Sequence, residues 1–324
     1  MNNRRKLILA LNAGVLGAPL GLLAQQSEPY PAKPVRIIVP SAAGAGDDIP
    51  ARMLAAKMSE LLGQQFVVDN RAGAGGMIGQ TFVAKSPPDG YTLLLAGGSM
   101  AGAHYVNANM GYDLQRDFTP ISLIETVPWS FVASPALSAR NVQEFIALAR
   151  SRPGKLSYGT IGAGQIPYWS VRMFNSMAGI EALEVPYKNG PDAITDLIAG
   201  RLDYYFPALV NAVTSKDKLR VLAVTSRVRS ALLPDVPTMA ESGLPEYEMP
   251  AWRSIMGPAG MRREIVDILN GTMVKALAWA DLRERLASTG SVATSSTPEE
   301  LRKRYSDWSA IFGRIARDAG LKPQ

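Results

Sequence analysis

Nine residues between a short apolar run and a helix-forming segment constrain the fold of this chain more than any other feature. The segment 40–48 reads PSAAGAGDD, follows the apolar run Val35–Val39 and precedes the helix-forming residues 49–58. A turn made mostly of glycine and alanine lets a ligand approach the backbone closely. The helix behind it directs free N–H groups and the positive end of its dipole at that ligand. The segment therefore predicts a strand, a binding turn and a helix.

The same order of strand, small-residue turn and helix recurs along the chain. We expect further strands at 65–69, 91–96, 156–159, 182–186 and 219–225, another after Gly200, and small-residue turns at 70–76, 97–99 and 160–168. Repeated units of this kind build mostly parallel sheets with helices on both faces. Ligands bind such sheets beyond the carboxyl ends of the strands. We therefore expect an α/β protein whose small-residue turns share a binding edge.

Beyond Trp252 the pattern predicts only helices, at 263–279, at 282–288 and from Thr297 onward. Thr297 and Glu300 form a capping-box pattern, and the apolar stripe that follows at helical spacing predicts a core-facing helix. Helices without strands of their own must pack on an existing sheet, so we expect the chain to return to its first lobe. The predicted lobes are 30–132 plus 252–324 and 133–251, joined by a hinge of two crossovers.

The first 24 residues predict an export signal that is cleaved near Ala24. A basic start, Arg4–Lys6, precedes an apolar run, 7–23, that glycine and proline interrupt. We therefore expect a periplasmic protein. Without the three basic residues the chain has 31 basic and 28 acidic side chains, scattered without a basic cluster, which argues against nucleic-acid binding.

Composition excludes several kinds of chemistry. The chain has no cysteine and one histidine, so thiolate nucleophiles, disulfides and multi-histidine metal sites are ruled out. The glycine turns lack the third glycine of a dinucleotide motif and the G-K-[ST] of a P-loop, so backbone binding of a carboxylate is the favoured interpretation. We predict no catalytic residue, metal site or cofactor. An exported hydrolase that uses Ser99 and His104 is the enzymatic alternative, although His104 is expected to be mainly structural.

Four charged residues near the turns admit two interpretations each. We expect Asp48 to cap the following helix, with Pro50 in its first turn. Asp47 is harder to explain structurally and would attract a ligand amine, or it shapes the loop. Lys188 faces the cleft or is solvated, and Arg71 bonds loop carbonyls or a ligand carboxylate, the loop role being favoured.

Several segments, taken together, resemble the Bug family, the extracytoplasmic solute receptors of tripartite tricarboxylate transporters. The resemblance runs from YPAKPVR at 30–36 to GLKP at 320–323, and its signposts are Asp48-Ile49, NRAGAGG at 70–76, PDGYTL at 88–93, VPYK at 185–188, LAVTS at 222–226 and LPDVPT at 233–238. It implies a two-lobed periplasmic binding protein of the type II kind, in which loops 41–48 and 160–168 grip one carboxylate. Each lobe is expected to be a mixed, mostly parallel sheet flanked by helices.

The candidate ligand-binding residues lie in these loops and at the ends of neighbouring strands. They are Ser41, Ala42, Ala43, Gly44, Ala45, Gly46, Asp47, Asp48, Gly98, Ser99, Thr160, Gly162, Ala163, Gly164, Gln165, Tyr168, Tyr187 and Pro207. The chain departs from the family pattern at Ser41, Ala45, Pro167-Tyr168 and Pro207, where the family usually has Phe, Gly, Ser-His and Asp. The negative charge missing at Pro207 is offset by Asp47, which predicts a ligand preference of its own.

The function predicted from these features is capture of a small carboxylate, an organic acid or an amino acid, in a cleft between two lobes. The implied partners are the carboxylate and the membrane permease subunits of a tripartite tricarboxylate-type transporter, with no nucleic acid. A sensor that presents its closed form to a membrane signalling receptor is a further alternative. We expect the receptor to be a monomer.

Overall fold

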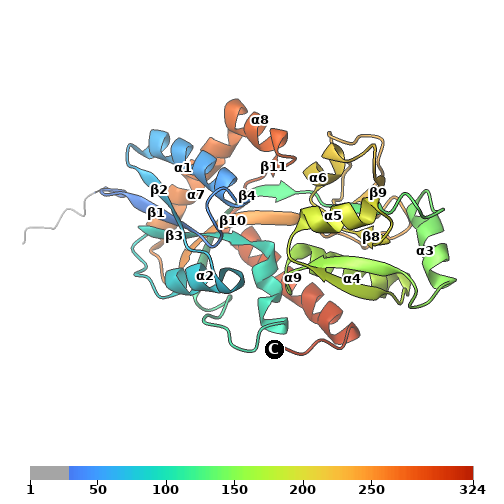
Figure 1. Cartoon of the computed structure of the whole chain (residues 1–324). Helices are drawn as coiled ribbons and strands as arrows, with labels where there is room; N and C mark the ends of the chain where they lie inside the picture. Colours follow the sequence, from blue (N-terminus) through green and yellow to red (C-terminus); the bar gives the residue numbers. More distant parts are fainter. Residues whose placement is uncertain (1–28, 324) are drawn as a thin grey trace, which may run out of the picture.

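The computed structural model describes residues 29–323, in two lobes that lie side by side (Figure 1). The predicted export signal, 1–24, lies outside the described residues. Each lobe is built on one mixed sheet with helices packed against it. Among residues 29–323, no helix is both long and apolar enough to cross a membrane.

The sheet of the first lobe has six strands in the order β11-β4-β10-β3-β1-β2. They are β1 Val35–Val39, β2 Phe66–Asn70, β3 Thr92–Gly97, β4 Phe118–Val127, β10 Ala251–Pro258 and β11 Val292–Ala293. Strand β1 pairs in parallel with β2 and β3, whereas β10 runs antiparallel to β3 and β4. The three parallel strands are the predicted strand–turn–helix units, so their carboxyl ends share one edge.

The sheet of the second lobe has five strands in the order β7-β6-β8-β5-β9. They are β5 Ser130–Ala133, β6 Ser157–Ile161, β7 Leu183–Tyr187, β8 Tyr204–Tyr205 and β9 Arg220–Val224. Strand β6 pairs in parallel with β7 and β8, and β5 pairs antiparallel with β8 and β9. The expected mixed sheets are confirmed, with a larger antiparallel share than predicted because strands next to the crossovers reverse direction.

Helices cover both sheets in the described part of the chain. The first lobe carries α1 Asp48–Leu62, α2 Met77–Ala84, α7 Arg263–Ala278, α8 Ala280–Ser288 and α9 Pro298–Asp318, with 3-10 helices η1 Ala74–Gly76 and η2 Gly98–Tyr105. The second carries α3 Val142–Arg150, α4 Ile166–Ala178, α5 Gly190–Ile198 and α6 Leu209–Thr214. Most lie within a few residues of the predicted helices, because their apolar spacing follows the helical period.

The prediction that the chain is purely helical beyond Trp252 is wrong. Strand β10 lies in the middle of the first sheet, and β11 forms its edge. Arg253 and Ser254 interrupt the apolar pattern of β10, and both are satisfied by partners from distant segments, so no local pattern reveals the strand. Strand β4 was likewise not expected.

Two crossovers connect the lobes and lie against each other. The chain leaves the first sheet after Val127 and enters the second at Ser130, so the predicted boundary at 132 falls inside β5. Trp129 lies in this crossover. Its backbone N–H donates to Thr225 Oγ1 at 3.1 Å, and its carbonyl accepts from the Thr225 backbone N–H at 2.9 Å. The Thr225 carbonyl also accepts from the Met249 N–H at 3.0 Å, just before β10, so Thr225 bridges the outgoing and the returning crossover.

Helix α9 packs below β10 and reaches from the first lobe to α4 of the second (Figure 1). Its N-terminus has the predicted capping box, in which Thr297 Oγ1 accepts from the Glu300 N–H and the Glu300 carboxylate accepts from the Thr297 N–H. Phe312, fully buried, stacks against Trp169 of α4 with ring centroids 4.6 Å apart. The predicted apolar stripe is therefore core, and it joins the lobes.

We expect Phe312→Ala to lower the free energy of unfolding by about 3–5 kcal/mol, because it leaves a cavity where the two lobes meet. Chemical denaturation followed by tryptophan fluorescence measures the change. Arg314→Ala, an exposed position on the same helix, is the control and should change stability by less than about 0.5 kcal/mol. Equal effects of the two substitutions would contradict the packing role of Phe312.

Candidate functional site

The first glycine turn is held by a carboxylate that points back into it. Asp48 Oδ2 accepts from the Gly44 N–H at 2.9 Å and from Arg52 Nε at 2.9 Å, while Asp48 Oδ1 accepts from Asn70 Nδ2 at 2.9 Å. Gly44 has a φ of +77°, a conformation that favours glycine. Asp48 thus fixes the turn to the end of β2.

The predicted capping role of Asp48 is wrong, since Asp48 is the first residue of α1 and its side chain binds the preceding loop. Asp47 holds the N-cap position without a side-chain cap bond, and Pro50 lies in the first turn as predicted. The hydrogen bond from Arg52, helped by those from Gly44 and Asn70, lowers the pKa of Asp48 to about 2. Burial opposes this shift, so the bonds more than offset desolvation.

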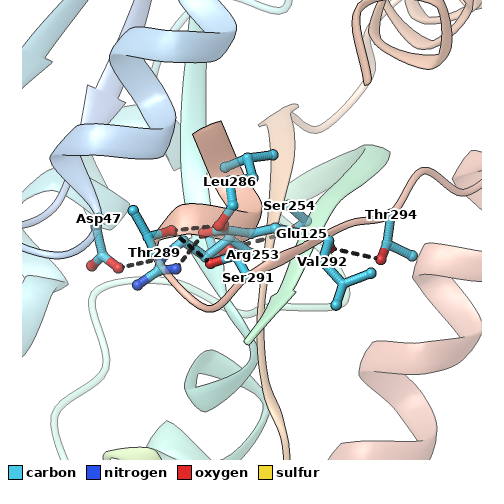
Figure 2. Close-up of polar contacts among 10 residues, drawn as sticks. Asp47, Glu125, Arg253, Ser254, Leu286, Thr289, Ser291, Val292 and Thr294 are labelled. Carbon is cyan, nitrogen blue, oxygen red and sulfur yellow. Dashed lines mark hydrogen bonds and ion pairs between the residues drawn. The ribbon is translucent and has the colours of Figure 1, made fainter. Parts of the chain in front are cut away.

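An arginine that is largely but not fully buried joins the first turn to the middle of the sheet. Arg253 Nε donates to Asp47 Oδ1 at 2.5 Å, and Arg253 Nη1 donates to Glu125 Oε1 (Figure 2). Burial by itself would lower the pKa of Arg253. The carboxylates of Asp47 and Glu125 together raise it by more than burial lowers it, so the pKa lies above its ordinary value. We call these three residues the Asp47–Arg253–Glu125 triad.

The triad follows from strand register. Arg253 on β10 stands directly opposite Glu125 on β4 and next to Gly97 on β3, so its side chain emerges where the parallel strands end. The Glu125 side chain is 1% exposed, and a charge buried that deeply needs a partner. Single charged residues inside two otherwise uncharged strands are the only sequence signal for this pair.

A cavity of about 440 Å³ opens beside the triad, between the two lobes. Its walls come from the first turn, the second glycine turn, the end of β3, both crossovers and the start of α4. The lining residues are Pro40, Ser41, Asp47, Gly73, Gly75, Gly76, Gln80, Leu95, Ala96, Gly97, Gly98, Ser99, Trp129, Ile161, Gln165, Ile166, Pro167, Ala251, Trp252 and Arg253. The carboxyl ends of strands from both lobes therefore meet around one space.

Three hydrogen-bond donors in this wall are buried and unpartnered among the described residues. They are Ser41 Oγ, Trp129 Nε1 and Trp252 Nε1. Buried polar groups are paired in the great majority of folded proteins, and an unpaired one costs about 1–3 kcal/mol. Because these donors are buried, a ligand that brings acceptors would reach them only after the wall moves.

The structure brings part of the predicted site residues to this cavity. Ser41, Asp47, Gly98, Ser99 and Gln165 line it, and Ala163 and Gly164 line a smaller cavity next to it. The remaining ones line neither: Ala42, Ala43, Gly44, Ala45, Gly46, Asp48, Thr160, Gly162, Tyr168, Tyr187 and Pro207. Ligand contact by any of them stays a prediction.

Several of the residues outside the cavity have structural partners. Thr160 Oγ1 donates to Glu184 at 2.8 Å, and Tyr187 Oη donates to Asp196 at 2.9 Å. The Pro207 carbonyl accepts from the Ser130 N–H and ties β8 to β5. Tyr168 lies in the first turn of α4, which begins at Ile166. The Tyr168 ring packs against the Arg172 guanidinium.

The other charged or reactive candidates lie away from the cavity. His104 is outside its wall, burial lowers the pKa of its imidazole, and no hydrogen bond joins it to Ser99 in the described part of the chain. The base contact required by the hydrolase alternative is thus missing there. Arg71 bonds no loop carbonyl among the described residues: it pairs with Asp69 at 3.1 Å, covers the Phe82 ring and lies outside the wall of the cavity, while contact with a ligand carboxylate stays a prediction. Lys188 is exposed.

No sequence motif predicts the aromatic part of the wall. Trp129 lies on the first crossover and Trp252 at the start of β10, in segments that carry no motif. Trp252 packs flat against the backbone of Gly98, where a Cβ atom would come within 2.6 Å of the indole. Gly98 is therefore needed for the close approach of the ring, a reason that its position in a small-residue turn does not reveal.

The fold and the cavity define a two-lobed binding protein, and comparison with known proteins assigns its family. The model of the tripartite tricarboxylate transporter family receptor matches residues 50–321. Protein BugT of Bordetella pertussis is 34% identical over 315 residues, covering 95% of this chain and 96% of BugT. The chain therefore belongs to the Bug family of tripartite tricarboxylate transporter receptors, as its motifs predicted.

Solved structures agree in fold over nearly the whole chain. The R. palustris protein Rpa4515 with adipate has a TM-score of 0.78 and 34% identity, covering 91% of this chain and 100% of the other. MatC from Rhodopseudomonas palustris with bound malate has a TM-score of 0.73 and 29% identity, covering 89% and 100%. The two-lobed α/β architecture predicted from the sequence is confirmed.

The low pKa of Asp48 predicts a pH-dependent contribution to stability. Its folded-state pKa of about 2 lies below the ordinary value of 3.8, so the contribution is present above pH 4 and is lost as pH falls toward 2. We expect Asp48→Asn to lower the free energy of unfolding by about 1–2 kcal/mol at pH 7, with the difference from wild type shrinking below pH 4.

Urea denaturation of both proteins between pH 2.5 and pH 7 measures this difference. Asp307→Asn, which removes an exposed partner of Lys303, is the control and should change stability by less than about 0.5 kcal/mol at neutral pH. A wild-type–variant gap that stays constant down to pH 2.5 would show that Asp48 acts without its charge.

Proposed function

We propose that this chain is a periplasmic receptor that captures a small carboxylate in the cavity between its lobes and delivers it to a membrane transporter of the tripartite tricarboxylate type. The observation that carries the proposal is the set of three unpartnered donors, Ser41 Oγ, Trp129 Nε1 and Trp252 Nε1, in the wall of one interlobe cavity. A carboxylate supplies the acceptors that these donors lack.

Family membership and the structural neighbours support the same ligand class. The matching family model is that of a transporter receptor, and two similar structures contain adipate and malate. Both lobes contribute to the wall, so closing them around a ligand would remove it from water and strengthen each hydrogen bond. We infer that the protein acts by binding, because its family is one of transporter receptors and its described wall offers donors for a carboxylate.

We expect Ser41→Ala and Trp129→Phe each to weaken carboxylate binding by about 5–30-fold, the loss of one hydrogen bond of about 1–2 kcal/mol. Isothermal titration calorimetry with a panel of mono- and dicarboxylates measures the dissociation constants. Trp279→Phe, an exposed tryptophan on the outside of the first lobe, is the matched control and should change affinity less than twofold.

Thermal shift gives an independent reading of the same panel. A ligand at 100 times its dissociation constant should stabilise the protein by about 2.7 kcal/mol. Absence of any stabilising carboxylate, or unchanged affinity in both cavity variants, would contradict the proposed function. Uptake of the identified ligand by cells with and without this protein separates transport from a sensing role.

A further inference from the structure

The charges around the cavity do not match a ligand with two carboxylates. Asp47 and Arg253 are the two charged side chains among the residues that line the cavity, and the adjoining smaller cavity has none. Arg253 is bonded to both Asp47 and to Glu125 behind it. One cation thus faces two anions, and the triad carries a net negative charge before any ligand enters.

The arginine has little positive charge to offer a ligand. Its Nε and Nη1 groups already donate to carboxylates, and the Glu125 side chain is 1% exposed, so water screens that anion weakly. The buried donors that are unpartnered, Ser41 Oγ and the two indole N–H groups, are neutral, and Arg253 Nη2 makes no hydrogen bond within residues 29–323. These donors and Arg253 Nη2 can hold one carboxylate, but the triad is already net negative, so a second carboxylate meets no uncompensated cation in the described wall.

The acceptors of the triad are only partly used. Asp47 Oδ1 receives Arg253, whereas Asp47 Oδ2 has no hydrogen-bond partner within residues 29–323, and the Asp47 side chain is 41% exposed on the cavity side of the first turn. Glu125 Oε2 is buried and also unpartnered there. A wall with unpaired neutral donors and an unpaired carboxylate oxygen suits a ligand with an acceptor end and a donor end.

We propose that the Asp47–Arg253–Glu125 triad makes this receptor selective for ligands with one carboxylate and one N–H-bearing end, an amide or an ammonium group, against dicarboxylates. The carboxylate binds the neutral donors and the N–H end binds Asp47 Oδ2. A second carboxylate in that place meets Asp47 at close range in a site of low dielectric, which is strongly unfavourable. Asp47 is therefore a specificity-determining residue. This inference rests on the proposed function and narrows its ligand class.

Pairs of ligands that differ only at one end test the triad. Succinate, glutarate, adipate and malate are each titrated by calorimetry beside their own monoamide, and 4-aminobutanoate, 5-aminopentanoate and 6-aminohexanoate are added as zwitterions. Each monoamide keeps the shape of its diacid and removes one charge. For the best-fitting chain length we expect the monoamide or the zwitterion to bind at least about 10-fold more tightly than the diacid.

The same panel is measured with Asp47→Asn, and with Asp307→Asn as the matched control on the exposed face of α9. Asp47→Asn should strengthen binding of the diacid and weaken binding of the zwitterion. The ratio of the zwitterion affinity to the diacid affinity should therefore fall at least about 10-fold, whereas Asp307→Asn should leave this ratio unchanged. Thermal melting of Asp47→Asn confirms folding, and Asp47→Ser serves as the second variant.

The outcomes distinguish this inference from the proposed function. A wild-type protein that binds a diacid as tightly as its monoamide and the zwitterion overturns the inference while carboxylate capture stands. The inference is also overturned if Asp47→Asn and Asp47→Ser both leave the ratio of zwitterion affinity to diacid affinity unchanged, because Asp47 would then only shape the turn. If no member of the panel binds, the proposed function fails and the inference fails with it.

Discussion

The ion pairs of Arg253 are the interaction on which the binding site depends. They join three segments that are far apart in sequence, since Asp47 lies 206 residues and Glu125 128 residues from Arg253. Breaking a buried pair by removing one partner leaves an uncompensated charge, which is costly, so the first turn, β4 and β10 are held in register by electrostatics as well as by the strand ladder. The position of the first turn is thus set from the middle of the sheet.

The hinge and the cavity are built from the same residues. Thr225 bonds to Trp129 on the outgoing crossover and to Met249 on the returning one, and Trp129 and Trp252 both belong to the wall of the cavity. A ligand bound to these residues contacts the segments about which the lobes would move. Helix α9 packs against both lobes and limits that motion, because its buried ring Phe312 stacks on Trp169. We therefore expect binding and closure to be coupled through the crossovers.

The sequence predicted the elements whose causes are local. The apolar run before 40–48, the glycine turn and the capping box at Thr297 all lie in continuous segments, and the structure has each of them. It did not reveal β10, since Arg253 and Ser254 are compatible with a strand only through partners that the fold supplies. Nor could it reveal the unpartnered indole of Trp129, because burial depends on both lobes. The predicted helix cap at Asp48 is wrong because its carboxylate accepts from Gly44 and Asn70 instead of from the N–H groups of the first helical turn. Asn70 comes from a distant segment, so only the fold shows this competition.

The indole N–H resonances of the five tryptophans give the most direct measurement of the central claim, that an interlobe cavity binds a carboxylate through unpartnered donors. In a protein with ¹⁵N-labelled tryptophan, each resonance is assigned by Trp→Phe substitution and followed by NMR during titration with the tightest-binding carboxylate. The account predicts that the Trp129 and Trp252 signals move on binding, as expected for a new hydrogen bond, while that of exposed Trp279 stays in place. Saturable binding with the Trp129 and Trp252 signals unmoved would contradict it.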